Sequence, residues 1–449
     1  MKLSLRTFVI LAMALLFVSA PSEASAQKRS SRAARNAAAA KANLKNLAAA
    51  DTAFMNYDFE AARDFLDTYV EKRTKEDAAR DMNFTYSPTT DTIDYTEYLG
   101  AKIDMGRSML DRVEEIEIID SINVPQSEFF NFIKISPTAG RLIDEDIARR
   151  VVTQSQMKEL GISYVASPAY VTESGEDILW VGVDDEGNSS MFESITLADG
   201  SWDKPVKLFD FPSIFGNDNG TAVSSPFLMP DGVTLYFAAD GQESLGGLDI
   251  FISRRDDRGF LQPSNIGMPY NSPYNDYLYA VDETTGAGWW ATDRNQLEDS
   301  VTIYTFIPKE LRINYPADTP GLTDFAKVTS IAATQQPDKD YARTLRRIAN
   351  AQELRAGRQE DAFDFAMPDG RVLHRLSDFR SSLARNAMQE YLKEKAALEK
   401  MAADLAKMRH DYATGNTSVG PNIIAFEDDY ATRSAELINL SNQVVTLEQ

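Results

Sequence analysis

The chain contains no cysteine and only two histidines, His374 and His410. The absence of cysteine excludes disulfides, thiolate nucleophiles, cysteine metal ligands and a lipidated N-terminal cysteine. A Ser-His-Asp arrangement needs a histidine beside its nucleophile, and the sequence has no Gly-x-Ser-x-Gly elbow to supply that nucleophile. Phosphate-binding glycine loops and two-histidine metal motifs are also missing. We therefore expect no enzymatic activity, no cofactor and no metal site.

After residue 26 the chain has no long apolar run. No segment there approaches the roughly 18 consecutive apolar residues that a membrane span needs. Residues 1–26 themselves have the order of a secretory signal peptide. Lys2 and Arg6 precede an apolar run over 8–18, and Ala24-Ser25-Ala26 forms a small-residue cleavage site. A membrane anchor is the alternative, but the run is too short to cross about 30 Å of hydrocarbon. We predict export to the periplasm or cell envelope and no transmembrane span after cleavage.

Basic residues are outnumbered, with 46 lysines and arginines against 68 acidic residues and a net charge of −22. An acidic surface repels phosphate backbones, so we expect no nucleic-acid partner. The 449 residues suffice for two or three domains, and a hydrophobic content of 43% supplies a core.

The N-terminal part, residues 27–80, is predicted to be helical. A basic, alanine-rich stretch over 28–45 is either an arm or the start of a helix, and apolar residues over 42–80 then recur at three- and four-residue steps. Residues 50–63 resemble one tetratricopeptide helix-turn-helix unit. Such a unit does not bury its own apolar face, so it is expected to dock elsewhere on the protein or on a partner.

Short β-branched and aromatic runs between turn residues follow, and three passages repeat. They cover Ser167–Leu208, Ser224–Gly267 and Asn275–Phe306. Shifts of about 58 and about 53 residues superimpose their hydrophobic runs, which fits one four-stranded propeller blade each. We assign 81–335 to a β-propeller-like domain with its clearest repeats at 160–316.

Turn residues punctuate each repeat. Pro230-Asp231-Gly232 predicts a tight turn, Gly246-Gly247 precedes a second turn, and Asp240 and Asp249 can accept hydrogen bonds from turn amides. Asp293 takes the place of Asp240 in the third passage. A structural role for these aspartates is favoured over a metal site.

These residues resemble the Pro-Asp type WD-like repeats of TolB-like propellers and of exported Bacteroidetes proteins. The resemblance covers about a third of the chain, is strongest in the second passage, and implies a propeller fold without implying an activity. Closed propellers have about 4–8 blades and the sequence shows three. We expect a partial propeller or one supplemented by strands from 84–136, 317–335 or another chain, with residues 113–124 patterned as a strand.

The C-terminal part, residues 336–449, is predicted to hold a β-hairpin over 361–376 and two long helices. The first helix is expected to start near Asp378 as N-cap, and Tyr391, Leu398, Leu405 and Tyr412 repeat every seven residues in it. An antiparallel coiled-coil hairpin is favoured, and the alternative is a homo-oligomer formed through these helices.

Two kinds of surface site are also considered. Gly216–Gly220 is rich in acidic and amide residues, but an ordinary loop is favoured over a Ca²⁺ site because the spacing of ligands is absent. Asp-Ser/Thr followed by an aliphatic residue or alanine resembles the O-glycosylation motif of exported Bacteroidetes proteins. The acceptors in that motif are Thr52, Thr92, Ser121 and Ser300.

The mainly β architecture with helical flanks therefore predicts a non-catalytic periplasmic or outer-membrane-associated scaffold. It would present a propeller surface to protein partners in the cell envelope. The combination of helical and propeller repeats resembles components of an envelope secretion machinery, although their peptidoglycan-binding domain is absent. The alternatives are a carboxylate-dependent hydrolase of glycans or peptides and a structural subunit that oligomerises through its C-terminal helices.

Overall fold

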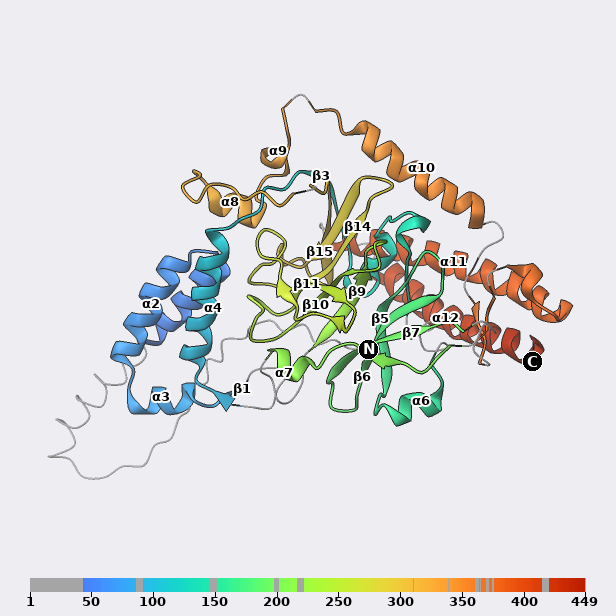
Figure 1. Ribbon diagram of the computed structural model, residues 1–449, viewed down its shortest axis with the longest axis horizontal. Coiled ribbons are helices and arrows are strands. Elements are labelled where there is room, and N and C mark those ends of the chain that lie inside the picture. The colour runs from blue at the N-terminus through green and yellow to red at the C-terminus, as the bar shows by residue number, and fades with distance from the viewer. Residues whose placement is uncertain are drawn as a thin grey trace.

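The structure is a computed structural model, and Figure 1 shows a central group of antiparallel sheets with helices on both sides. The predicted signal peptide lies outside the described residues. The structure describes residues 43–85, 92–144, 152–197, 202–215, 222–309, 311–337, 339–359, 363, 365–368, 371–373, 375–413 and 420–448.

Helices form the N-terminal part, which we call the helical cluster. It consists of a helix over 43–55, α2 (Phe59–Lys72), α3 (Lys75–Asp81) and α4 (Tyr95–Leu110), with a short ribbon of β1 (Phe84–Thr85) and β2 (Thr92–Ile93). The side chain of Asp58 accepts the amide of Ala61 and so caps α2, and Thr74 with Asp77 forms a capping box at α3. The helix-turn-helix over 43–72 agrees with the predicted periodicity, whereas α4 lies inside the range assigned to the propeller-like domain.

Each of the three repeated passages forms one antiparallel sheet. The strands of the first sheet run in the order β4 (Arg141–Ile143), β5 (Tyr164–Val171), β6 (Asp177–Val183), β7 (Ser189–Ile195) and β8 (Val206–Lys207). The second sheet contains β9 (Val223–Leu228), β10 (Thr234–Ala239), β11 (Asp249–Asp256), β12 (Gly259–Phe260) and β13 (Ser264–Asn265). The third sheet contains β14 (Asp276–Asp282), β15 (Ala287–Thr292) and β16 (Ser300–Phe306), and its fourth strand is β3 (Ile118–Pro125).

The sequence repeat is therefore also a structural repeat. β9 and β10 begin 53 residues before β14 and β15. The backbone amides of Asp240 and Asp293 donate to the carbonyls of Ala222 and Asn275, again 53 residues apart. The fourth strand of the third sheet comes from far upstream, because β3 pairs with β16 from Ser300 opposite Pro125 to Phe306 opposite Ile118. The strand predicted over 113–124 is thus present, shifted toward its C-terminal end.

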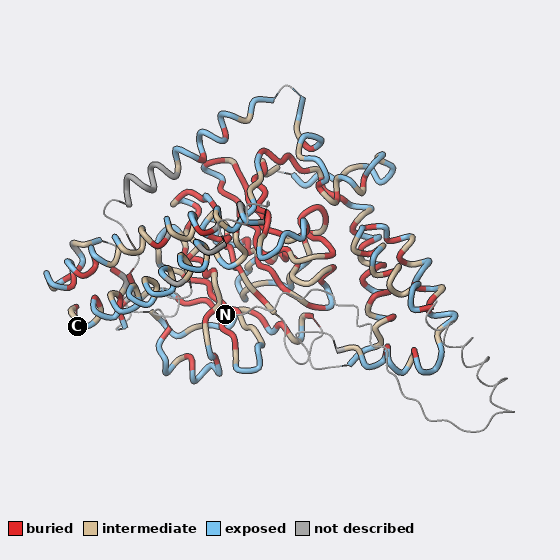
Figure 2. The backbone as a smooth tube through the Cα atoms, turned by 180° about the vertical axis from the view of Figure 1, so that it is seen from behind, coloured by how far each residue is buried: buried red, intermediate tan, exposed pale blue. Residues whose placement is uncertain are grey.

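Aromatic side chains fill the space between the sheets. The rings of Tyr170 and Phe227 join the first and second sheets with centroids 5.1 Å apart, and those of Tyr236 and Tyr279 join the second and third at 4.5 Å. The connection from β3 to β4, with η1 (Gln126–Phe132) and η2 (Pro137–Ala139), packs into the same core. Figure 2 shows buried backbone concentrated in this central region. Short helices α6 (Gln154–Glu159) and α7 (Phe211–Phe215) lie in the connections of the first two sheets.

The chain leaves the third sheet through α8 (Leu322–Lys327), α9 (Ile331–Thr334) and α10 (Ala342–Gln359). In Figure 1, α10 runs along the upper edge of the molecule. The sequence patterns did not predict α10, because its single apolar stripe is interrupted by arginines.

The C-terminal unit contains a hairpin of β17 (Phe365–Ala366) and β18 (Val372–Leu373), a turn η3 (Leu376–Asp378), and the long helices α11 (Ser382–Ala413) and α12 (Gly420–Glu448). Arg409 pairs with Glu427 at 2.8 Å and Arg433 with Glu394 at 3.1 Å, so the two helices are antiparallel.

Two details of the C-terminal prediction need comment. The prediction of Asp378 as N-cap is wrong, because Asp378 lies in η3, where it accepts the amide of Arg375, and α11 begins at Ser382. The heptad residues Leu398 and Leu405 are 5% exposed within one chain, since α12 covers them. The middle of the apolar seam is therefore used inside the hairpin, whereas Tyr412 near the end of α11 is 47% exposed.

Candidate functional site

The first group of predicted turn residues connects β9 to β10. The side chain of Asp231 accepts the amides of Val233 and Thr234 at 2.8 Å each, and Gly232 has φ +66°, a conformation that favours glycine. Partial burial raises the pKa of Asp231, but these amide donors outweigh it and hold the pKa below its ordinary value. Pro230 precedes them at the exposed start of the turn.

The second group lies between β10 and β11 and is more deeply buried. Asp249 accepts the amides of Leu245 at 2.8 Å and Gly246 at 3.2 Å, and its carboxylate also binds Asn265 at 2.6 Å. Burial raises the pKa of Asp249 to about 7, and the nearby charge of Asp276 adds to that shift. This carboxylate therefore holds the shape of the β10–β11 loop.

Both glycines of this loop are required by close packing. A Cβ at Gly246 would overlap the carbonyl oxygens of Tyr274 and Ser272, and one at Gly247 would overlap the side-chain oxygen of Asn275. The loop therefore packs directly on the connection that leads into β14.

Asp293, the counterpart of Asp240, connects strands of the third sheet. It accepts the amide and the side-chain amide of Asn275 at 2.8 Å each and the hydroxyl of Tyr277 at 2.9 Å. Gly246, Gly247, Asp249 and Asp293 thus lie around one junction, between the β10–β11 loop and the start of β14, whereas the Pro230–Gly232 turn lies at the other end of β10.

Lys102 of α4 enters this junction from the helical cluster and is 3% exposed. Its ammonium donates to the carbonyl oxygens of Gly241 at 3.0 Å, Gln242 at 3.3 Å and Ser244. Burial lowers the pKa of Lys102 to about 8, and the carboxylate of Asp240 is the largest of the charges that oppose the shift. A lysine on the apolar face of a helix, beside Leu99 and Ile103, was the sequence signal that could have identified this contact.

A second buried cation lies close by. Arg294 pairs with Asp276 at 2.9 Å, and the two side chains are 2% and 0% exposed. Burial raises the pKa of Asp276, and the charge of Arg294 opposes that rise. Arg294 also donates to the carbonyl of Tyr270 at 2.8 Å. The ring of Tyr57, from the turn before α2, is buried beside this pair.

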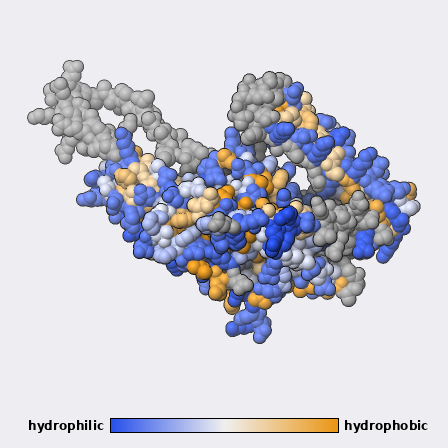
Figure 3. Space-filling view, turned by 90° about the horizontal axis from the view of Figure 1, so that it is seen from above, coloured by the Kyte–Doolittle hydropathy of each residue, from blue (hydrophilic) through white to orange (hydrophobic). Residues whose placement is uncertain are grey.

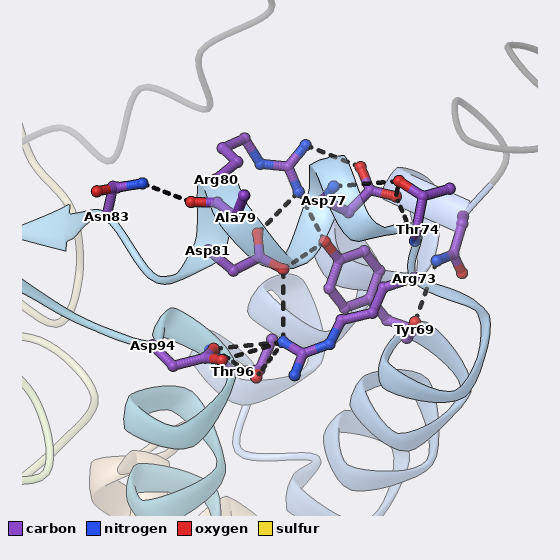
Figure 4. Close-up of polar contacts among 11 residues, drawn as sticks. Tyr69, Arg73, Thr74, Asp77, Ala79, Arg80, Asp81, Asn83, Asp94 and Thr96 are labelled. Carbon is purple, nitrogen blue, oxygen red and sulfur yellow. Dashed lines mark hydrogen bonds and ion pairs between the residues drawn. The ribbon is translucent and has the colours of Figure 1, made fainter.

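Charged side chains also stabilise the far end of the helical cluster (Figure 4). Asp81 accepts the hydroxyl of Tyr69 at 2.7 Å and pairs with Arg80 at 2.8 Å. Arg73 reaches Asp94 at 3.1 Å, across the start of α4. Because these contacts connect α2, α3 and α4, the helical cluster behaves as one rigid element.

A cleft of about 610 Å³ opens where the helical cluster meets α8. Small-molecule and side-chain pockets have a similar volume. The rings of Tyr57 and Phe59 form its apolar part, and the ammonium of Lys327 lies 5.6 Å from the centre of the Tyr57 ring. Its rim carries charges of both signs, and Glu60 pairs there with Arg107 at 2.8 Å. This cleft is the candidate binding site. Five of its lining residues, Asn56–Glu60, lie in the 50–63 unit that was predicted to dock elsewhere, but none of them was predicted as a binding residue.

The four predicted glycosylation acceptors differ in exposure. Thr52 and Thr92 are exposed, and the hydroxyl of Thr52 donates to the carbonyl of Ala48 at 2.8 Å. Ser121 and Ser300 are half-buried in the strands β3 and β16. The predicted loop over 216–220 lies outside the described residues.

Across the described part of the chain, no three histidine, aspartate or glutamate side chains gather closely enough to share a metal ion. None of the described helices combines the length and the apolar character that a bilayer span requires. Comparison of the chain with protein-family models, with curated proteins and with solved structures finds no match.

Proposed function

We propose that this protein is a non-catalytic binding or scaffold protein of the periplasm or outer membrane, with protein partners in the cell envelope. In this proposal the three sheets are blades of a partial propeller, supplemented by β3 and by the connection over 126–139. The 53-residue spacing of equivalent strands and the aromatic core shared by the three sheets support the propeller.

The observation that carries the proposal is the junction between the helical cluster and the sheets. Lys102 crosses it with three hydrogen bonds to carbonyl oxygens, and Leu245 and Met268 of the second sheet's loops share an apolar core with Phe54 and Leu99. A joint with both polar and apolar contacts keeps two elements in a fixed relation. The same apolar core includes Leu322 and Ala326 of α8, so the cleft between the helical cluster and α8 is preformed, which lowers the entropic cost of binding a partner.

The carboxylates in the sheet turns have structural partners, which supports binding over catalysis. Asp231 and Asp249 accept backbone amides, Asp276 pairs with Arg294, and Asp282 accepts the amides of Ser136 and Thr284. A carboxylate that acts as a general acid or base must reach a substrate proton. Asp249, Asp276 and Asp282 are instead buried in the fold, and the exposed Asp231 is held by the amides of its own turn.

Photocrosslinking in the native envelope tests the binding role. A photoreactive residue at Asp111, on the cleft rim, should yield one or a few defined protein adducts, while the same residue at Lys158 on α6 serves as the control. Arg107→Ala with Lys327→Ala should weaken the Asp111 adducts without changing the melting temperature. Equal adducts from both positions, or adducts that persist in the double variant, would contradict the assignment of the cleft.

Export is tested separately by fractionation and N-terminal sequencing. The mature protein should begin at Gln27 and be recovered with the envelope fraction. A cytoplasmic protein that retains residues 1–26 would reject the location. The intact mass of the same sample reports on glycosylation, because a mass equal to that of the bare chain excludes modification at Thr52 and Thr92.

A further inference from the structure

The helix α10 is basic in a protein that is otherwise strongly acidic. Its 18 residues contain five arginines and one glutamate, whereas the whole chain has a net charge of −22. A basic amphipathic helix is typical of elements that bind anionic surfaces.

Only one side of α10 contacts the body of the protein. Ile348 is 6% exposed and Thr344 is 8% exposed, and both face the third sheet, where Ile348 lines a small cavity with Trp289 and Ile303. The side chains of Arg343, Arg346 and Arg347 are exposed. In Figure 2, the part of α10 over 342–351 is mostly exposed, with buried positions at Thr344 and Ile348.

The three arginines form no ion pairs with the residues that the structure describes. Arg346 donates to the carbonyl of Ala342 at 3.2 Å, and Arg347 donates to the hydroxyl of Thr344 at 3.0 Å. These are contacts within one helix, and among the described residues no carboxylate pairs with either guanidinium. Leu345, 39% exposed, lines the same small cavity as Ile348 on the side of α10 that faces the third sheet.

We propose that α10 docks the protein on an anionic phospholipid bilayer. The charge of α10 is complementary to phosphate headgroups, which arginine binds through paired N–H donors. A helix of 18 residues is about 27 Å long, and its exposed residues Arg343 and Arg346 lie within one turn of each other. Figure 3 shows hydrophilic residues over much of the face seen from above, with smaller hydrophobic patches among them.

The acidic remainder of the chain sets the orientation. Charges more than about 8–10 Å from the bilayer are screened at physiological salt, so they repel it weakly once α10 is in contact. Faces that carry exposed carboxylates would bring like charges to the headgroups. This proposal rests on the proposed envelope location in one respect, which is the identity of the membrane that is bound. The binding assay itself requires no protein partner.

Vesicle sedimentation with the full mature chain tests the proposal. Vesicles of phosphatidylcholine with about 30% phosphatidylglycerol should bind the protein in low salt and release it in high salt, and vesicles of phosphatidylcholine alone should not bind it. Each basic residue at a membrane contributes about 1 kcal/mol, so Arg343→Gln, Arg346→Gln and Arg347→Gln together should weaken binding on the order of 100-fold.

The matched control carries the same change of charge elsewhere. Arg112→Gln, Arg254→Gln and Arg258→Gln replace three exposed arginines outside α10 and should leave binding within about twofold of the wild type. Equal losses in both triple variants, or no preference of the wild type for anionic vesicles, would overturn the proposal. Displacement by inorganic phosphate at matched ionic strength, or retention on immobilised polyglutamate without vesicle binding, would also overturn it.

Failure here is distinguishable from failure of the proposed function, because the photocrosslinks at Asp111 depend on the cleft and not on α10. Melting curves of the triple variants show whether they fold. If the α10 variant unfolds, the salt and lipid dependence of the wild type still decides the result.

Discussion

Lys102 makes the stability of this protein depend on pH in an unusual direction. Its pKa is lowered to about 8 in the folded protein, against 10.5 for the same group in the unfolded chain. Between these values the unfolded state binds the proton and the folded state does not. Stability contributed at this position therefore rises with pH, from below pH 8 to above pH 10.

The two pKa values determine the size of the effect. From pH 7 to pH 9.5, proton linkage at Lys102 alone should increase the free energy of unfolding by about 2 kcal/mol. The side chain is almost fully buried, so solvent screening does not reduce this value. Other lysines and tyrosines also titrate over this range, and a reference variant is needed to remove their contribution.

Lys102→Met is the reference, because methionine keeps most of the length of the side chain and has no titratable group. Urea unfolding of both proteins at pH 7, 8, 9 and 9.5 gives the difference in free energy at each pH. The variant should be less stable at every pH, since three carbonyl oxygens lose a donor. The advantage of the wild type should grow by about 2 kcal/mol across the series. An advantage that is constant or falls with pH would refute the reasoning.

Three further predictions concern packing, a buried ion pair and a helix terminus. Gly246→Ala should lower the free energy of unfolding, measured in urea, by at least about 2 kcal/mol, because the new Cβ overlaps backbone oxygens. In the control Gly100→Ala the new Cβ meets flexible side chains, and the free energy of unfolding should change by less than about 1 kcal/mol. Arg294→Met should destabilise the protein by about 3–5 kcal/mol by leaving Asp276 buried without its cation, and Arg294→Met with Asp276→Leu should recover part of that loss in thermal unfolding. Glu448→Ala should destabilise the C-terminal unit by about 1–2 kcal/mol, because the Glu448 carboxylate accepts two backbone amides at the start of α11; unchanged hydrogen exchange in α11 would contradict this.

Much of the fold could be predicted from local patterns. The turn at Pro230-Asp231-Gly232 and the alternation of the flanking strands depend on residues only a few positions apart. The same is true of the repeat spacing, the helix-turn-helix over 43–72 and the helices of the C-terminal hairpin. Such features follow from backbone preferences and hydrophobic periodicity, which are properties of short stretches of sequence.

The candidate site could not be predicted in this way, since its parts come from distant segments. The cleft combines Tyr57, Arg107 and Lys327, and no spacing along the chain relates them. Lysine side chains are usually exposed, so the sequence alone would place Lys102 at the surface. Its contact with the β10–β11 loop exists only because α4 packs against that loop.

The sequence by itself determined the three repeated sheets, the helical flanks and the absence of cysteine chemistry, because each depends on composition or local periodicity. Tertiary structure alone decided that β3 completes the third sheet, that Leu398 and Leu405 are covered by α12, and that Arg343 and Arg346 are exposed. The physical reason is that strand pairing and burial are settled by competition between distant segments for the same core.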